Sequence, residues 1–169
     1  MPKPFCALLV VLLGCASDGA SPAPYDETRR AFPSVEAAVL HLSQHAMLES
    51  KLVGIGGTES RGFIAFHSIL DSPRPRQHLL SLARRGSVVG KIYGLIGLNH
   101  VDPAAYQELE AVVLREHGQE PILVMLGCVG QTRTVAEVVR GSNSWPMPVR
   151  DGSWWREYSR SGAPPRNGV

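Results

Sequence analysis

The sequence has no excess of charge of either sign, and this lack argues against two classes of partner. Its 169 residues include 17 lysines and arginines and 15 aspartates and glutamates, a formal net charge of +2. Nucleic-acid binding and electrostatic adhesion to a membrane both call for a clear basic surplus. We therefore expect neither. The length and the 44% share of hydrophobic residues are typical of a chain with one globular domain.

The sequence also offers no apolar run near its start that is long enough to span a membrane. The run at residues 5–13 has nine residues, whereas a spanning helix needs about 20. Lys3 is the one charged residue before this run, and small residues follow it. A basic start, a short apolar stretch and small residues at its end are typical of a secretory signal peptide.

The end of this stretch, Leu12-Leu13-Gly14-Cys15, resembles the lipobox of bacterial lipoproteins. The resemblance implies cleavage before Cys15, a thioether-linked diacylglyceryl group on its sulfur, and acylation of the new amine, as with palmitate. Two or more acyl chains anchor a protein stably where one does not. We therefore expect a lipid-anchored protein of the bacterial cell envelope, facing the periplasm or in the outer membrane. The alternatives are an ordinary signal peptide or a buried N-terminal strand.

Cysteines are scarce, and the lipobox prediction uses two of the three. Cys6 would leave with the signal peptide (residues 1–14) and Cys15 would carry lipid, so Cys128 would stand alone. The mature chain then has no intramolecular disulfide and depends on an apolar core. Residues 15–33 are small, polar and proline-bearing, which predicts a flexible tether. Residues 141–169 are rich in Gly, Pro, Ser and Arg, which predicts an irregular tail with a disordered end.

Between these segments, residues 34–140 predict a mainly α domain. Ser34 can cap a first helix whose apolar positions recur on one face as far as Val53. Further helices are expected after Ser60, after Ser72-Pro73, from Asp102 to Gly118, and after the capping box that begins at Thr134. The apolar run at residues 121–129 predicts one short strand or extended segment.

The stretch "SVVGKIYGLIGLN" is ambiguous, because its β-branched residues favour a strand. Gly90, Gly94 and Gly97, however, would share one face of a helix, where the missing side chains would let another helix approach closely. We therefore predict a buried helix over residues 88–98. On this basis Gly94→Ala should be near neutral, and Gly94→Leu should destabilise the protein clearly.

The expected series of short antiparallel helical hairpins resembles a HEAT or armadillo stack over residues 60–117. The stretch "GKIYGLIGLNHVDPAAYQEL" also resembles a segment of uncharacterised bacterial lipoproteins. The matching positions are Lys91, Tyr93, Gly97, Leu98, Asp102, Pro103 and Tyr106. Both resemblances imply a fold and a location, and neither supplies an activity.

Three histidine and glutamate positions are the candidate metal ligands. His41, His45 and Glu49 are spaced four residues apart, which would place them on one face of the first helix. Two imidazoles and a carboxylate can hold zinc. The metalloprotease signature requires a glutamate directly after the first histidine, and Leu42 stands there instead. A solvated polar edge is the commoner meaning of such a pattern, so we expect no metal and no other cofactor.

Two other features could carry a function. Cys128 could be a nucleophile activated by a histidine, but a cysteine inside an apolar run is usually a small buried hydrophobe. The cluster Trp154, Trp155, Arg156 and Tyr158 could contact a sugar, peptidoglycan or a membrane interface. Alternatively, its tryptophans fold back over the helices, because adjacent exposed tryptophans are costly.

The leading hypothesis for function is therefore a non-enzymatic, lipid-anchored scaffold or protein-binding module. It would reach the membrane through its lipid and would bind an unidentified protein partner. The rival is an envelope hydrolase or metal-dependent enzyme that uses Cys128 or the His41, His45 and Glu49 face. Neither a nucleophilic serine motif nor a complete metal motif supports the rival.

Overall fold

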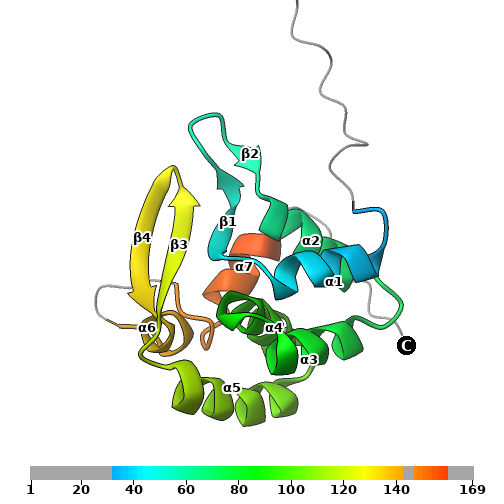
Figure 1. The fold of residues 1–169 in the computed structure, drawn as a ribbon, viewed down its shortest axis with the longest axis vertical. Coiled ribbons are helices and arrows are strands. Elements are labelled where there is room, and N and C mark those ends of the chain that lie inside the picture. Colours follow the sequence, from blue (N-terminus) through cyan, green and yellow to red (C-terminus); the bar gives the residue numbers. More distant parts are fainter. Residues whose placement is uncertain (1–31, 143–146, 160–169) are drawn as a thin grey trace, which may run out of the picture.

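A four-stranded mixed sheet organises the computed structural model, which describes residues 32–142 and 147–159 (Figure 1). Helices make up 58% and strands 19% of the structure. The predicted mainly α, HEAT-like stack with one short strand is therefore wrong. The elements in chain order are α1 (Val35–Ser43), β1 (Met47–Val53), β2 (Thr58–Glu59), α2 (Arg61–Leu70), α3 (Pro75–Arg85), α4 (Val88–Val101), α5 (Pro103–His117), β3 (Pro121–Gly127), β4 (Val129–Thr134), α6 (Val135–Arg140) and α7 (Ser153–Ser159).

The sheet has the strand order β2-β1-β3-β4. Strands β1 and β3 pair in parallel, with Leu48 opposite Val124, and both outer pairs are antiparallel hairpins. Leu48 and Val124 are fully buried against the helices. The helices lie mainly on one side of β3 and β4, and the ends of both hairpins project past them (Figure 1).

The first helix ends at Ser43 rather than near Val53, and strand β1 takes its place. Within β1, Leu48 and Ser50 are buried while their neighbours are more exposed, which is the two-residue period of a strand. The pairing partner that stabilises this conformation is β3. A partner so distant along the chain leaves no local signal in the β1 sequence, and the sequence analysis therefore missed the strand.

Glycines make the turns of both hairpins. Gly54 and Gly57 have φ angles of 74° and 62° in the β1–β2 turn, and Gly127 has 59° before the β3–β4 turn. These left-handed conformations strain residues that carry a side chain. The strand predicted within residues 121–129 is confirmed as β3.

The helix caps were predicted well where the capping side chain lies next to its helix. The hydroxyls of Ser34 and Ser60 accept from main-chain N–H groups of α1 and α2, Asp102 does so for α5, and Thr134 and Glu137 form the capping box. Helix α3 differs, because it begins at Pro75 with no side-chain cap rather than after Ser72-Pro73.

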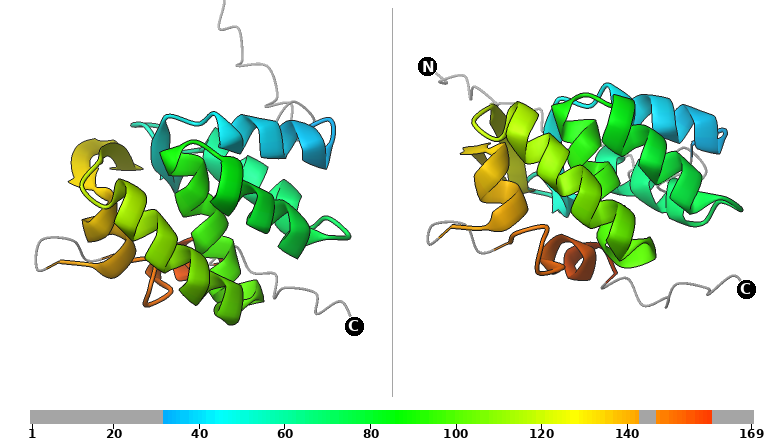
Figure 2. Two further views of the ribbon diagram at one scale, coloured as in Figure 1. Left: turned by 60° about the horizontal axis from the view of Figure 1, so that its bottom comes forward. Right: turned by 90° about the horizontal axis from the view of Figure 1, so that it is seen from below.

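Helix α4 is the buried helix predicted for residues 88–98, and it packs between α3 and α5 (Figure 2). Its glycines are the points of closest approach to its neighbours. A Cβ atom built on Gly90 would lie 2.6 Å from the carbonyl oxygen of Leu42, and one on Gly97 would collide with the side chain of Leu79. The missing side chains are therefore what allow α1 and α3 to pack so close to α4.

Part of the segment expected to be an irregular tail is built into the core. Residues 153–159 form α7, whose Trp154 and Tyr158 are fully buried. The Asn99 side chain donates to the carbonyl of Val149 at 2.8 Å, and the Arg150 guanidinium donates twice to Glu110, at 2.7 and 3.0 Å. These bonds fasten the segment that precedes α7 to α4 and α5.

No helix within residues 32–142 and 147–159 is both long and apolar enough to cross a membrane. The predicted signal peptide, Cys15 and the tether up to residue 31 lie outside the described residues, as does the end of the chain from residue 160. The lipobox prediction thus remains a prediction.

Candidate functional site

The three candidate metal ligands come close together, although not on one helix. His41 lies on α1, His45 follows that helix, and Glu49 lies on β1. The rings of the two histidines are 4.7 Å apart, and His45 Nε2 lies 3.0 Å from Glu49 Oε2. In the described part of the chain, no group of three or more His, Cys, Asp or Glu side chains could hold a metal ion.

The carboxylate of Glu49 is engaged at the start of α2 instead. Its Oε2 atom accepts the Gly62 main-chain N–H at 2.9 Å in addition to its bond with His45. Burial raises the pKa of Glu49, but the hydrogen bonds from His45 and Gly62 outweigh it, so the pKa lies below its usual value. An anion at a helix N-terminus is also favoured by the helix dipole.

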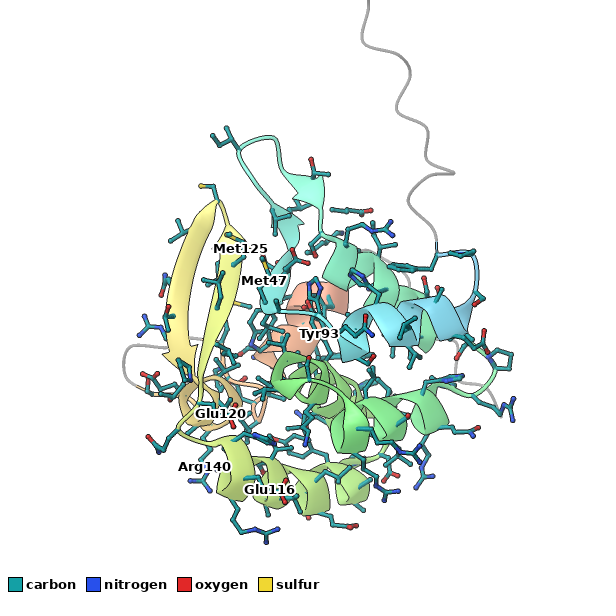
Figure 3. The ribbon with its side chains drawn as sticks, in the orientation of Figure 1. Met47, Tyr93, Glu116, Glu120, Met125 and Arg140 are labelled. Atoms are coloured by element: carbon teal, nitrogen blue, oxygen red, sulfur yellow. The ribbon has the colours of Figure 1, made fainter. Side chains whose placement is uncertain are left out.

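The main chain of Glu49 forms hydrogen bonds with two tyrosines, Tyr93 and Tyr158. Tyr93 is labelled in Figure 3. The Glu49 N–H donates to Tyr93 Oη at 3.2 Å, and its carbonyl accepts from Tyr158 Oη at 2.6 Å. The two phenol rings stack with centroids 6.2 Å apart and planes 8° apart, and burial raises the pKa of each. We call His45, Glu49, Gly62, Tyr93 and Tyr158 the Glu49 cluster. It joins β1, α2, α4 and α7, and its bonding pattern is that of a structural polar network.

His67 lies in the same region as His41, and both imidazoles are half-buried. His67 on α2 lies with Nε2 3.2 Å from the carbonyl oxygen of Tyr158, and its ring packs 4.3 Å from that of Phe63. The buried Nε2 atom of His41 has no hydrogen-bond partner among the described residues. Burial is the main reason why the pKa values of both imidazoles lie below the ordinary value.

The aromatic–basic cluster predicted as a contact site is largely internal. Trp154 and Tyr158 are fully buried. Trp155 is half-buried and stacks on His100, with ring centroids 4.0 Å apart. The Arg156 side chain bonds within its own segment, to the Asp151 carbonyl at 2.7 Å and the Ser153 hydroxyl at 3.0 Å. Buried rings offer no surface to a ligand, so this cluster gives a contact site little support.

Cys128, which was expected to be buried, is exposed in the turn between β3 and β4. In the apolar run before Cys128, Ile122 and Val124 are buried, and the residues from Met125 to Gly127 are only partly buried. No residue in the described part of the chain forms a hydrogen bond with its sulfur, so the geometry provides no activating base.

A chain of three polar side chains was not anticipated. The ammonium of Lys91 lies 3.2 Å from Nε2 of His117, whose Nδ1 lies 2.6 Å from a carboxylate oxygen of Glu120. Figure 3 shows Glu120 at the foot of the β3–β4 hairpin. A carboxylate, an imidazole and a lysine can act as a proton relay. Among the described residues, however, no serine, threonine or cysteine hydroxyl or thiol bonds to the relay and could serve as a nucleophile.

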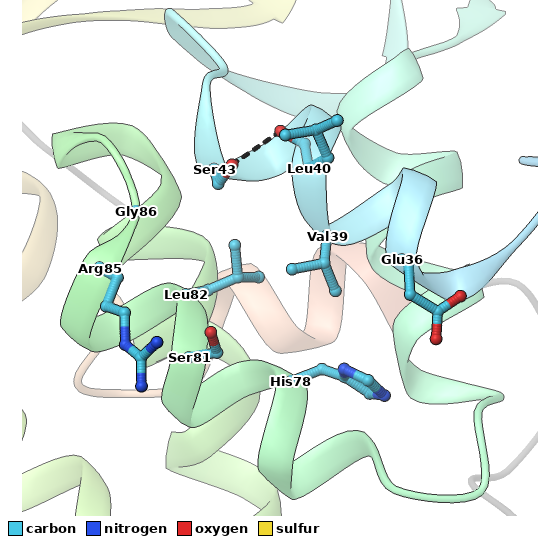
Figure 4. Close-up of a pocket in the computed structure, with 9 residues that line it drawn as sticks. All are labelled: Glu36, Val39, Leu40, Ser43, His78, Ser81, Leu82, Arg85 and Gly86. Atoms are coloured by element: carbon cyan, nitrogen blue, oxygen red, sulfur yellow. Dashed lines mark hydrogen bonds between the residues drawn. The ribbon is translucent and has the colours of Figure 1, made fainter.

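The feature that best fits a binding site is a groove of about 320 Å³ between α1 and α3 (Figure 4). Val39 and Leu82 give it an apolar floor, and Leu40 stands at its edge with 57% of its surface exposed. The remaining lining residues are polar or small, and they are Glu36, Ser43, His78, Ser81, Arg85 and Gly86.

Charge is distributed unevenly along the sequence, which the small net charge conceals. Residues 61–101 contain six arginines and lysines and one acidic residue, whereas residues 102–120 contain five acidic residues and one arginine. Arg84 and Arg85 at the end of α3 are exposed and form no ion pair within the described residues. Their guanidinium groups can therefore pair with a carboxylate on another molecule.

The groove could not be predicted from the sequence for an identifiable reason. Cations are common at the C-terminal end of a helix, so Arg84 and Arg85 do not by themselves indicate a binding site. The signal available was Leu40, a large apolar residue beside the buried face of α1 rather than on it. Such a residue marks a contact surface once the neighbouring helix is known.

No protein-family model, no curated protein and no solved structure gives a significant match to the chain.

Proposed function

We propose that the protein is a lipid-anchored component of the bacterial cell envelope whose domain binds a partner protein and catalyses no reaction. The observation that carries the binding part of this proposal is the groove between α1 and α3. Its apolar floor and exposed Leu40 can accept an apolar side chain of the partner, and Arg85 can pair with an acidic one. The anchoring part rests on the predicted lipobox at Cys15.

The chemistry of the groove suggests what the partner presents. An interface gains most from an apolar side chain that fills a pocket and from an arginine pair at its edge. Burying the exposed 57% of Leu40 would contribute about 1–2 kcal/mol in area terms. The hydroxyl of Ser81 can bond to the backbone of a bound segment, whereas that of Ser43 already donates to the Leu40 carbonyl at 2.8 Å. We therefore expect a short acidic segment with one or two large apolar residues.

The enzyme alternative has weaker support from the same structure. Glu49 already bonds to His45 and Gly62, and Cys128 stands in a solvent-exposed turn without a base among the described residues. A hydrolase or metal-dependent enzyme would need these residues to be free and to converge on a cleft.

A cross-linking experiment tests the binding proposal. A photoreactive amino acid placed at Leu40 in the full lipidated chain should give one discrete adduct in intact envelopes, and Arg85→Glu should abolish it. The same probe at Val101, which is 38% exposed at the end of α4, serves as the matched control. Equal labelling from both positions, or none from Leu40, would contradict the proposal.

The anchoring proposal has its own test. Cys15→Ala should lose lipid label and release the protein from the membrane fraction. If the variant keeps its label and its membrane association, Cys15 is not the point of lipid attachment.

A further inference from the structure

The exposed apolar side chains gather on the two hairpins of the sheet. Among the described residues, six large hydrophobic side chains are exposed. Four of the six lie on the hairpins, and they are Leu52, Ile55, Leu123 and Val129. Ile55 is the extreme case, because its whole surface is exposed at the β1–β2 turn. A fully exposed isoleucine in a rigid glycine turn has no role in the core of its own domain.

The ends of these hairpins also carry no charge. Residues 52–58 and 121–132 contain no Asp, Glu, Lys or Arg, in a chain where 19% of residues are charged. The two ends form one surface, because the Gly54 N–H donates to the carbonyl of Gly127 at 3.1 Å. They project beyond the helices (Figure 1). We call Leu52, Ile55, Cys128 and Val129 the apolar hairpin surface.

We propose that the apolar hairpin surface enters the interfacial region of the bilayer that holds the lipid on Cys15. This inference rests on the lipid anchor of the proposed function. It adds an orientation to that anchor, because the hairpin ends project at one end of the molecule while α3 and α5 lie toward the opposite end (Figure 1). With the hairpin ends in the bilayer, α3 and its side of the groove would lie away from the bilayer, accessible to a partner.

The number of residues between Cys15 and the domain limits how far the domain can lie from the bilayer. Cys15 and Phe32 are 17 positions apart, so even a fully extended tether holds the domain within about 60 Å of the lipid. A tethered contact of this kind benefits from a high effective concentration, so a small apolar surface suffices. Interfacial insertion does not require a spanning element, since apolar side chains reach about 5–10 Å into the boundary region.

The backbone of the hairpin ends can tolerate such an environment. In the β1–β2 turn the Gly57 N–H donates to the Gly54 carbonyl at 3.2 Å, and the Gly54 N–H is used by Gly127. Polar main-chain groups that are already bonded lose less on leaving water. The absence of charged side chains at residues 52–58 removes the largest cost of entering the interface.

A protein partner on this surface is the competing occupant, and the structure favours it less. Protein interfaces have a polar rim and are anchored by arginine or aromatic residues. The apolar hairpin surface has neither, and it projects as two narrow ends rather than as a groove. The groove between α1 and α3 has the charged rim that the hairpin ends lack.

The experiment uses the full lipidated chain in vesicles of phosphatidylethanolamine and phosphatidylglycerol. In a Cys128→Ser background, Ile55→Cys and Val129→Cys are labelled with an environment-sensitive fluorophore, and Leu40→Cys is the matched control. Leu40 is an exposed leucine that lines the groove and is not part of the apolar hairpin surface. Lipids carrying a quencher should dim positions 55 and 129 at least about twofold more than position 40, because an interfacial side chain lies below the headgroups.

Four outcomes decide between the possibilities. Selective quenching at positions 55 and 129 supports the inference. Vesicle-bound protein with no selective quenching overturns it and leaves the lipid anchor standing. Labels at 55 and 129 that are shielded from an aqueous quencher without lipid quenching show a protein cover, a partner or a second copy, and also overturn it. Protein that does not float with the vesicles contradicts the anchor, and the inference then falls with the proposed function.

Discussion

The main-chain nitrogen of Ala83 in α3 lies 2.6 Å from the point where a Cβ atom on Gly94 in α4 would stand. The Cα of Ala83 lies 2.9 Å from the same point. Backbone atoms cannot rotate out of the way as a flexible side chain can. The packing of α3 against α4 therefore depends on the hydrogen that glycine carries in place of a side chain.

This geometry corrects the expectation that Gly94→Ala is near neutral. We now predict that Gly94→Ala lowers the free energy of unfolding by about 1–3 kcal/mol through overpacking, which exceeds the gain in helix propensity of up to ~1 kcal/mol. Gly94→Leu should destabilise the protein further. Urea midpoints measure both effects. Gly56→Ala is the control, since nothing lies within 4 Å of a Cβ there. A Gly94→Ala midpoint at or above that of the parent would contradict the prediction.

Glu49→Gln should destabilise the protein by about 1–3 kcal/mol at neutral pH, because a charge-assisted network is weakened in a partly buried site. The folded-state pKa of Glu49 lies below its ordinary value of 4.5. Its charge therefore contributes stability above pH 4.5, and this contribution is lost as the pH falls through the folded-state pKa. The difference in unfolding free energy between the parent and Glu49→Gln should therefore become smaller in acid. Urea unfolding at neutral pH and below pH 4.5 measures this difference. Glu108→Gln, at an exposed position, is the control. A difference that is constant with pH would argue against this role.

The pH dependence of stability should also depend on two half-buried histidines, His41 and His67. Burial lowers the pKa of His67 below its ordinary value of 6.5, so the unfolded chain binds the proton first as the pH falls. Stability is therefore unaffected well above pH 6.5 and decreases below it, until His67 is protonated in the folded state too. His67→Gln should reduce the slope of unfolding free energy against pH in this range, and His41→Gln should reduce it by a further part. If neither variant changes this slope, groups other than His41 and His67 cause the loss of stability in acid.

Removal of metal should leave the protein unchanged. Because Glu49 bonds to His45 and Gly62, we predict substoichiometric zinc in the purified protein and the same thermal midpoint before and after treatment with a chelator. Elemental analysis and thermal unfolding measure these quantities. Tight one-to-one zinc that disappears in the His41→Ala, His45→Ala double variant would restore the metalloenzyme hypothesis.

The parts of the fold that the sequence predicted are those whose determinants lie close together in the chain. Ser60, Asp102 and Thr134 each cap a helix through a residue three positions ahead. The glycine face of α4 follows from a spacing within one helix. Strand β1 could not be predicted in this way, because Met47 and Leu48 take their conformation from pairing with Leu123 and Val124.

The candidate site was harder to predict for the same reason. The groove needs Leu40 from α1 and Arg85 from α3 on one surface, and their approach depends on how both helices pack on α4. The near-zero net charge likewise hid the separation between the basic residues 61–101 and the acidic residues 102–120. The residues His41, His45 and Glu49 were grouped correctly, but on a helix that ends before two of them.

The hydroxyl of Tyr158 reaches the Glu49 carbonyl across 109 residues of sequence, and this separation has a consequence for folding. The parallel pair of β1 and β3 can form only after residue 127 is available, and the stacked tyrosines only after residue 158. Contacts between such distant segments slow folding, because a long loop must close before they stabilise anything. A chain that ends before α7 would leave Glu49 with an unpaired carbonyl and the core without Trp154. We therefore expect the domain to remain incompletely folded until α7 docks, and to be competent for translocation and sensitive to proteases until then.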